Sequence, residues 1–570
     1  MNSPTDNPAD VVRALADAGQ ALMDSFLHNL PAQGLDYAEL VSALTGSAEQ
    51  RGKLADLQAR FYHEWLSLWH DASGTGDAQP AGRDRRFESR EWRELPWFRL
   101  LHRSYLLNAA YLNGVAELAV LDPKKHKRLR FVTRQLVDAF APTNFAPTNP
   151  EAIKTALETQ GESLAQGLQQ LSRDIERGRI SMTDESAFEV GRNLALTPGD
   201  VVFENAVMQL IQYAPATERV YERPLLIVPP FINKYYILDL QPQNSFVRYS
   251  VEQGFTTFIV SWRNIPVELG TLGWEDYIEQ GVFAPLDATT QITGSRTVNT
   301  LGFCVGGTLL TTALAALAAK RRKRAHSLTL LATMLDFSDT GDISVYVDQA
   351  YVERCEAEYR AGGLVPGSRL ATTFATLRAN DLVWTFVVNN YLMGREPRPF
   401  DLLYWNADGS NLPGPLYAFY LRNMYLENNL RVPGRLHLCG SSIDIGRIKL
   451  PAYVFAARED HIVPWSSAYH SARLLGPRTE FVLGASGHVA GVVNPASLNR
   501  REFHTGGGPV RDPEQWLATA QRHPGSWWGH WSAWLAARSG EKKPSPSGSG
   551  SRKYPPIEPA PGRYVKERRN

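Results

Sequence analysis

Cysteine, net charge and long apolar runs are all scarce in this 570-residue chain. Its three cysteines, Cys304, Cys355 and Cys439, are too few for a disulfide framework and suit a reducing cytoplasm. The 60 basic and 59 acidic residues leave a net charge of +1, which gives no indication of a nucleic-acid partner. No apolar run approaches the ~18 residues of a membrane span, and the polar, acidic start is unlike an ordinary signal peptide. Metal-ligand spacings and phosphate-binding glycine loops are also missing, so we expect a cytoplasmic protein without a metal or other cofactor.

A glycine-x-cysteine-x-glycine run at residues 302–306 is the most informative motif that is present. It follows the apolar stretch 298–301, which reads as a strand, and precedes the small, apolar stretch 308–319, which reads as a helix. Glycines beside a nucleophile let the chain turn sharply, so the side chain of Cys304 would point out above a sheet. The positive end of the helix favours the thiolate over the thiol. Alone, the motif is as typical of a buried structural cysteine as of a nucleophile, so the surrounding sequence must decide between the two interpretations.

An acid and a base follow in the order that such a turn requires. Residues 451–457 read as a buried strand leading to Asp460, and residues 479–483 as a strand ending in a glycine-rich loop with His488. Each of the three residues follows the carboxyl end of an expected strand, the edge where open α/β sheets place their chemistry. His488 would remove and return a proton, because imidazole titrates near neutral pH. Asp460 would orient the imidazole or direct it toward a second, hydroxyl nucleophile.

Two neighbouring residues leave alternatives open. Asp336 follows the strand-like stretch 328–335 and is the second candidate for the acid, since some hydrolase-type sheets use this earlier strand. His461 would support the site through a hydrogen bond or simply pack beside Asp460. Taken singly, His488 is an ordinary loop histidine and Asp460 a turn residue. The catalytic interpretation therefore depends on Cys304, Asp460 and His488 occurring together.

The pattern divides the chain into three parts. Residues 1–200 read as a mainly helical N-terminal domain whose extreme N-terminus we expect to be disordered. Residues 201–540 alternate strands and helices, which predicts an α/β-hydrolase fold with a parallel sheet. An insertion at about 339–440, rich in large apolar and aromatic residues, exceeds a simple connection and predicts a cap. Residues 541–570 read as a flexible linker and C-terminal tail, because Pro, Ser, Gly and Lys are frequent there.

Several further runs resemble class I polyhydroxyalkanoate synthases, the enzymes that polymerise (R)-3-hydroxyacyl-CoA into storage polyester. The similarity extends from about residue 96 to the C-terminus and is densest between residues 224 and 494. Beside the motifs around Cys304 and His488, it is carried by residues 229–240, 379–384, 400–406, 411–415, 460–465 and 557–565. The family's nucleophile, acid and base fall on Cys304, Asp460 and His488.

The resemblance implies an acyltransferase that releases CoA through an acyl-cysteine intermediate and favours short monomers such as 3-hydroxybutyryl-CoA. A thiolate is a good nucleophile at neutral pH, and an acyl-cysteine keeps most of the transfer potential of the thioester. The resemblance also implies a homodimer that associates in the cytoplasm with the growing polyester chain, the granule surface and granule-associated proteins.

The reaction needs an oxyanion hole and a site from which water is excluded. The backbone N–H of Val305 would be one donor, and the N–H of Phe231 or Ile232, in the loop after the strand-like stretch 224–228, would be the other. The cap would exclude water and open for the substrate.

Two other functions are weighed against acyl transfer. A cysteine-dependent hydrolase of the same fold would share the motifs but would release carboxylic acid without chain growth. A non-catalytic granule-coat protein would have no use for an intact Cys304, Asp460 and His488.

Overall fold

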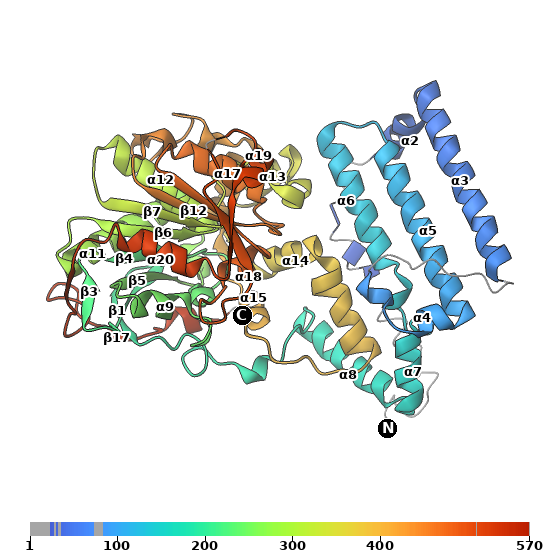
Figure 1. Ribbon diagram of the computed structural model, residues 1–570, viewed down its shortest axis with the longest axis horizontal. Coiled ribbons are helices and arrows are strands. Elements are labelled where there is room, and N and C mark those ends of the chain that lie inside the picture. The colour runs from blue at the N-terminus through green and yellow to red at the C-terminus, as the bar shows by residue number, and fades with distance from the viewer. Residues whose placement is uncertain are drawn as a thin grey trace. The chain divides into compact units, whose positions relative to one another are not determined.

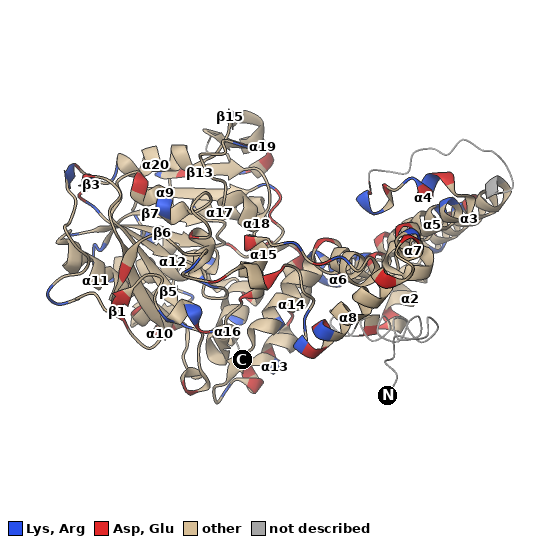
Figure 2. Cartoon of the chain, turned by 90° about the horizontal axis from the view of Figure 1, so that it is seen from below, with Lys and Arg blue, Asp and Glu red and all other residues tan. Residues whose placement is uncertain are grey.

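The computed structural model describes residues 23–24, 26–27, 30–31, 36–72, 84–508 and 510–568. The disorder expected at the extreme N-terminus concerns residues outside this set. The chain forms two compact units, Met1–Asp184 with Thr372–Arg398, and Glu185–Ala371 with Pro399–Asn570 (Figure 1). Basic and acidic residues are interspersed within each unit (Figure 2), in line with the balanced composition. None of the described helices combines the length and the apolar content needed to span a lipid bilayer.

The first unit is helical, as the sequence predicts. Helix α6 begins after Asp122, whose carboxylate accepts hydrogen bonds from the N–H groups of Lys124 and Lys125. Helix α8 ends at Gly178, which adopts a left-handed φ of 67°. The α-helices of this unit are α2 (Tyr37–Thr45), α3 (Ala48–Ala72), α4 (Glu91–Glu94), α5 (Pro96–Leu118), α6 (Pro123–Ala139), α7 (Pro150–Glu158) and α8 (Glu162–Arg177).

Residues 372–398 pack with this helical unit although they lie within the expected cap. They contain the end of α14 (Gly367–Leu377) and the π-helices η9 (Asn380–Trp384) and η10 (Val387–Leu392). The hydroxyl of Tyr391 donates to Asp174 on α8 over 2.7 Å, and Trp384 and Tyr391 share one buried cluster with Leu171. Trp384 and Tyr391 are therefore part of the helical unit's core, which the sequence did not predict.

The second unit is built on a mixed sheet of 11 described strands, in the order β15-β14-β13-β12-β7-β6-β4-β5-β2-β1-β17. The central strands β13, β12, β7, β6, β4 and β5 run parallel, and antiparallel strands extend both edges. This arrangement confirms the α/β-hydrolase fold class. The strands are β1 (Gly199–Glu204), β2 (Met208–Tyr213), β4 (Leu225–Val228), β5 (Thr257–Trp262), β6 (Val298–Phe303), β7 (Ala325–Leu331), β12 (Ala452–Ala457), β13 (Thr479–Gly484), β14 (Glu502–Thr505), β15 (Gln521–Pro524) and β17 (Glu558–Pro559).

Helices cover the sheet and form the remaining part of the insertion. Helix α12 packs on β4, β6 and β7, and α17 packs on β12 and β13. The helices that follow the strands are α9 (Phe246–Glu252), α10 (Trp274–Ile278), α11 (Ala284–Thr293), α12 (Val305–Ala319), α17 (Trp465–Leu474), α18 (His488–Val492), α19 (Pro513–Thr519) and α20 (Trp528–Ala536). The insertion adds α13 (Gln349–Glu358), α15 (Asp401–Ala407), α16 (Gly414–Tyr420) and the π-helix η11 (Leu421–Leu426).

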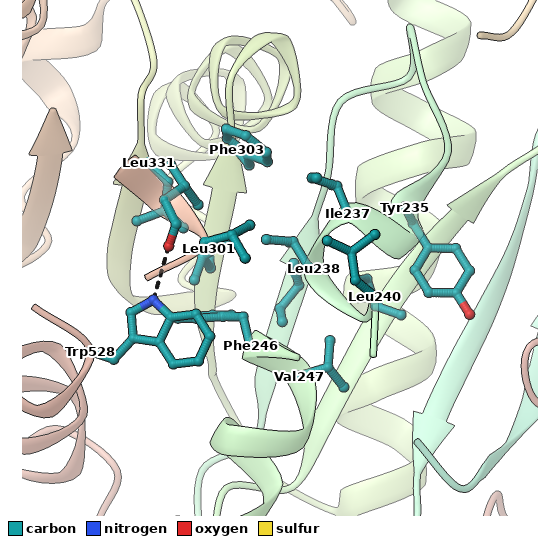
Figure 3. Close-up of a cluster of buried hydrophobic side chains, with 14 of the residues drawn as sticks. Tyr235, Ile237, Leu238, Leu240, Phe246, Val247, Leu301, Phe303, Leu331 and Trp528 are labelled. Carbon is teal, nitrogen blue, oxygen red and sulfur yellow. Dashed lines mark hydrogen bonds between the residues drawn. The ribbon is translucent and has the colours of Figure 1, made fainter. Parts of the chain in front are cut away.

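A buried apolar cluster supports the edge of the sheet at which the candidate site lies (Figure 3). Leu301 and Phe303 on β6 and Leu331 on β7 belong to it, together with residues 235–238 and Leu240. Trp528 on α20 closes the cluster, and its indole N–H donates to the carbonyl oxygen of Val492 over 2.9 Å. The indole thus satisfies its one polar group while burying its ring, the usual arrangement for a core tryptophan.

The C-terminal segment differs from the flexible linker expected from its composition. Residues Lys542–Pro544 form strand β16, which pairs with β3 (Arg219–Tyr221), and β17 pairs with β1 at the edge of the main sheet. Tyr564 and Val565 near the chain end are buried. Backbone pairing fixes this segment, and composition cannot reveal such pairing because it depends on main-chain groups that every residue carries.

Candidate active site

Cys304 occupies the turn between strand β6 and helix α12, as the motif predicts. It is half-buried and adopts φ 52° and ψ −129°, outside the regions that residues with a side chain normally occupy. Its N–H donates to the carbonyl oxygen of Leu331 over 2.9 Å, and its own carbonyl accepts from the N–H of Gly307 over 2.9 Å. These bonds hold a conformation that costs about 1–3 kcal/mol by itself. The residue directly after the nucleophile begins the helix, so its N–H has no partner within α12.

Two glycines permit this turn through their lack of a side chain. A Cβ on Gly302 would lie 2.4 Å from the Cα of Gly307, so strand and helix could not approach each other this closely. A Cβ on Gly306 would lie 2.3 Å from the carbonyl oxygen of Pro229 and 2.5 Å from that of Val228. The turn is therefore in close contact with the loop after β4, the loop that carries the second expected oxyanion donor.

The expected acid and base form a buried pair beside this turn. His488 begins α18 after β13, and Asp460 lies in the turn after β12. Nδ1 of His488 lies 2.7 Å from Oδ2 of Asp460, and both residues are buried. The other carboxylate oxygen of Asp460 accepts from the N–H groups of Ile462 and Val463, each over 2.8 Å. The carboxylate is thus fixed in position, so one imidazole nitrogen is committed to Asp460 and the other is available for chemistry.

The electrostatic surroundings link His488 to Cys304. Burial alone lowers the pKa of the imidazole, but electrostatic interactions and hydrogen bonds with Asp460 and Cys304 raise that pKa well above the usual 6.5. The ring also stacks on Phe303, with centroids 5.6 Å apart. His488 therefore interacts with both Cys304 and Asp460, although the three residues are far apart in sequence.

Backbone hydrogen bonds join the two loops that carry the pair. The N–H of Arg458 donates to the carbonyl oxygen of Gly484 over 2.8 Å, and that of Glu459 to Ser486 over 2.9 Å. The indole N–H of Trp527 then donates to the carbonyl oxygen of Gly491 at the end of α18 over 3.0 Å. The tryptophan-rich terminal helix thus has a role that the sequence did not reveal, which is to support the segment of His488.

The alternative acid, Asp336, has other partners. Its Oδ1 accepts from Ser338 Oγ over 2.6 Å and from Asn428 Nδ2 over 2.9 Å, and its carboxylate forms an ion pair with Arg431 at 3.2 Å. Although burial raises the pKa of Asp336, these hydrogen bonds lower it overall. Of the two candidate acids, Asp460 is the one paired with His488. His461 is half-buried in the turn directly after Asp460, and its supporting role stays a prediction.

The loop after β4 is fixed close to Cys304. Phe231 is buried, and its ring lies edge-on to those of Trp262 and Tyr277. The carbonyl oxygen of Ile232 accepts from the N–H of Ser410 over 2.8 Å. Pro229 at the start of this loop is the residue in close contact with Gly306. Val305, Phe231 and Ile232 therefore lie on two backbone segments that touch, while their role as oxyanion donors stays a prediction.

Two tyrosines of the insertion approach Cys304, and the sequence did not single out either as a site residue. Tyr420 ends α16 and Tyr425 lies in the π-helix η11, with ring centroids 5.3 Å apart. Burial and the electrostatic effect of Cys304 raise the pKa of both hydroxyls, and Tyr425 raises the pKa of Tyr420 further. Both hydroxyls therefore stay protonated. The ring of Tyr420 stacks on Trp274 with centroids 5.4 Å apart. The π-helix that carries Tyr425 is a feature frequent at functional sites, but it interrupts the helical repeat and leaves no periodic signal in the sequence.

Among the described residues, no three His, Cys, Asp or Glu side chains are placed to hold a metal ion. What the site brings together is a cysteine sulfur, an imidazole and a carboxylate bonded to that imidazole. This set suits the transfer of an acyl group through a covalent intermediate.

Comparison with known families places this site in an α/β-hydrolase fold. The family model described as "alpha/beta hydrolase fold" matches residues 223–495, which include Cys304, Asp460 and His488. A second model, "Poly-beta-hydroxybutyrate polymerase (PhaC) N-terminus", matches residues 83–250. The chain is thus an enzyme of the α/β-hydrolase fold class, and its N-terminal region matches that of a polymerase family.

Three relatives identify the family. The chain is 50% identical over 533 residues to "Poly(3-hydroxyalkanoate) polymerase subunit PhaC" of Cupriavidus necator, covering 92% of this chain and 90% of the relative. It is 40% identical over 520 residues to the protein of the same name from Rhizobium meliloti, covering 90% and 85% of the two chains. It is also 39% identical over 508 residues to "Poly(3-hydroxyalkanoate) polymerase 1" of Ectopseudomonas oleovorans, covering 89% and 90%. The chain belongs to the poly(3-hydroxyalkanoate) polymerase family, which confirms the resemblance seen in the sequence.

Proposed function

We propose that this enzyme polymerises (R)-3-hydroxyacyl-CoA thioesters into polyhydroxyalkanoate, with release of CoA, through an acyl group carried on Cys304. The observation that carries the proposal is the buried Asp460–His488 pair, with its 2.7 Å contact, beside a cysteine held in the turn before α12. Short monomers such as 3-hydroxybutyryl-CoA are the preferred substrates. The reaction requires no cofactor, since CoA enters as part of the substrate.

The first half of the reaction loads the enzyme. The thiolate of Cys304 attacks the thioester carbonyl and forms a new carbon–sulfur bond, and the electron pair of the carbonyl moves to its oxygen. When the tetrahedral intermediate collapses, the bond to the CoA sulfur breaks and CoA takes the proton held by His488. The raised pKa of His488 supports this step, because the imidazole is protonated while Cys304 is a thiolate.

The second half extends the chain. The 3-hydroxyl of another acyl group gives its proton to His488 and attacks the acyl-cysteine, forming an ester and releasing the Cys304 thiolate. Asp460 holds the imidazole with one nitrogen toward the reacting groups and stabilises its positive charge. Bond and proton counts return to the starting state, so the cycle repeats with each monomer.

The oxyanion of each intermediate needs two donors. The N–H of Val305, at the start of α12, is one, and the N–H of Phe231 or Ile232 is the other. Tyr420 and Tyr425 of the insertion interact electrostatically with Cys304, and their role is to limit the access of water, whose attack would end the chain as a free acid. His461 supports the turn that holds Asp460.

An exposed apolar stripe on α3 supports association with polyester granules in the cytoplasm. Tyr62, Trp65, Leu66 and Trp69 are 65%, 40%, 62% and 54% exposed, and their spacing places them on one side of the helix. A contiguous apolar surface of this kind is typical of an interaction site. The growing polymer and its granule surface are the proposed partners, with a second copy in a homodimer and granule-associated proteins as further ones.

One assay tests the proposal against hydrolysis. Purified enzyme with (R)-3-hydroxybutyryl-CoA is expected to release CoA together with an equivalent amount of ester-linked polymer. The Cys304→Ala variant is expected to do neither. Release of CoA with an equal amount of free 3-hydroxybutyrate would show a hydrolase, and release of CoA by the variant would show that Cys304 is not the nucleophile.

A further inference from the structure

The ammonium group of Lys234 is buried at the end of the loop that follows β4. The residue is 1% exposed, and it is the second residue after Ile232. Its Nζ donates to the backbone carbonyl oxygen of Glu567 over 2.8 Å and lies 3.5 Å from that of Tyr564. Burial lowers the pKa of this ammonium, against the charges of Asp408 and Glu567. A lysine is almost never buried so completely without partners that require it there.

Three other hydrogen bonds fix the same loop, and each comes from the folded unit around it. The indole N–H of Trp262 donates to the carbonyl oxygen of Pro229 over 2.9 Å, and the N–H of Ser410 to that of Ile232 over 2.8 Å. The indole N–H of Trp405 donates to the carbonyl oxygen of Lys234 over 2.7 Å. The bond from the Lys234 side chain differs from these three, because its partners lie within the last residues of the chain.

The chain end that receives this ammonium is itself firmly attached. The N–H of Tyr564 donates to Gln209 Oε1 on β2 over 3.1 Å, and its hydroxyl donates to the carbonyl oxygen of Asn205 over 3.0 Å. Val565 is 1% exposed. The guanidinium of Arg568 donates to the hydroxyl of Tyr404 on α15. Residues 564–568 are therefore a fixed support rather than a loose tail.

We propose that residues 564–568 position the oxyanion loop. Their main-chain carbonyls bind the ammonium of Lys234, and this bond holds residues 229–234 at the distance from Cys304 that the N–H of Phe231 or Ile232 needs. Lys234 is accordingly a positioning residue, and the chain end completes the active site without touching substrate. This inference rests on the proposed function, because it assigns the loop a role in that reaction.

Four variants test the coupling between Lys234 and the chain end. Lys234→Met removes the ammonium and keeps an unbranched apolar side chain, and a chain ending at Arg563 removes the carbonyls but retains β17. We expect each to lower kcat about tenfold to a hundredfold, because small displacements of catalytic groups have effects of this size. The two changes combined are expected to lose no more than about twofold beyond the larger single loss, since they break one interaction. Arg563→Ala, which removes exposed ion pairs just before this segment and keeps its carbonyls, should remain within about twofold of the parent enzyme.

Further measurements separate positioning from a general loss of structure. KM is expected to change less than about twofold, because oxyanion donors act mainly in the transition state. The rate at which iodoacetamide alkylates Cys304 should be unchanged, since the nucleophile and His488 are not displaced. Lys553→Met is the matched control, because this lysine lies in the same C-terminal segment and donates to Gln291 over 2.7 Å, on another part of the fold.

Several outcomes would overturn the inference. Full kcat in Lys234→Met would do so, as would losses that multiply in the combined variant or a fall in the alkylation rate that parallels the fall in kcat. If the chain ending at Arg563 does not fold, the comparison of Lys234→Met with Arg563→Ala and Lys553→Met decides alone. A parent enzyme that releases CoA without forming polymer would refute the proposed function instead, so the two failures are distinguishable.

Discussion

Replacement of Gly306 by alanine tests how closely the nucleophile's turn must contact the oxyanion loop. The added Cβ would lie 2.3 Å from the carbonyl oxygen of Pro229 and 2.5 Å from that of Val228. Real Cβ contacts are essentially never shorter than 3.0 Å, so the two backbones must separate by about 0.7 Å. Because both neighbours are backbone atoms, no side chain can rotate to relieve the contact.

The expected effect on activity exceeds the effect on stability. Overpacking of this kind costs about 1–3 kcal/mol of unfolding free energy, which a large domain survives. The displaced loop carries Phe231 and Ile232, and a shift approaching 1 Å in a catalytic group costs about a hundredfold in rate. We therefore expect Gly306→Ala to fold and to release CoA about a hundredfold more slowly than the parent enzyme, with little change in KM.

The matched control is Gly529→Ala on α20. No heavy atom lies within 4 Å of the Cβ that this change would add, and alanine is preferred to glycine in a helix by up to ~1 kcal/mol. The two variants are compared by thermal unfolding and by the rate of CoA release with (R)-3-hydroxybutyryl-CoA. If Gly306→Ala matches Gly529→Ala in both measurements, the turn and the loop are not in functional contact and the reasoning is refuted.

Three further predictions address the acid, the enclosure and the granule. Asp460→Asn should slow CoA release about a thousandfold or more, because the imidazole loses the anion that orients it. Asp460 raises the pKa of His488, so the stability that this pair adds is complete below the usual histidine pKa of 6.5 and is lost as pH rises through the raised pKa. The difference in melting temperature between the parent and Asp460→Asn should therefore be largest near pH 6 and should shrink at alkaline pH. A difference that grows with pH would contradict this. Tyr420→Ala should increase free 3-hydroxybutyrate relative to polymer, whereas the exposed Tyr37→Ala should not, and an unchanged product ratio would show that Tyr420 does not exclude water. Trp65→Ser with Trp69→Ser should lower the fraction of enzyme that sediments with polyester granules several-fold at unchanged CoA release, and equal sedimentation would assign the α3 stripe another role.

The parallel core of the sheet is the part of the fold that sequence reasoning predicts well. The expected strands at 224–228, 298–301, 451–457 and 479–483 correspond to β4, β6, β12 and β13, with ends that differ by a few residues. Such strands are buried on both faces and read as continuous apolar runs. The antiparallel edge strands β14 and β15 carry residues such as Glu502 and Arg522, so they lack this signal.

The insertion was predicted as one cap because large apolar and aromatic residues occur along its whole length, and the sequence does not show which of them pack together. The structure divides them, since residues 372–398 pack with the helical unit and Tyr420 and Tyr425 approach Cys304. Periodicity could not separate the two groups, because the π-helices η9, η10 and η11 interrupt the regular helical repeat on which such an argument depends.

The candidate site was predictable where a local motif coincides with a fixed order along the chain. A glycine-flanked cysteine, an acid after a later strand and a histidine after the next are all visible in sequence, and their joint occurrence identifies Cys304, Asp460 and His488. The contacts that hold them are not visible, since Trp527 reaches Gly491 and Lys234 reaches Glu567 from distant parts of the chain. Such contacts depend on the tertiary fold alone.

The choice between hydrolysis and polymerisation depends on the side chains around the sulfur more than on the triad of Cys304, His488 and Asp460. Attack by water and attack by a 3-hydroxyl both require the same thiolate, imidazole and carboxylate, so the triad cannot favour one acceptor over the other. The groups near the sulfur can, because Tyr420 and Tyr425 are half-buried side chains of the insertion that interact electrostatically with Cys304, and we expect them to help enclose the sulfur against water. A hydroxyacyl group binds with its own apolar chain, which makes its hydroxyl the better placed acceptor in such an enclosure. Substitutions of these tyrosines should therefore change the ratio of acid to polymer, whereas substitutions of the triad should lower the yields of both together.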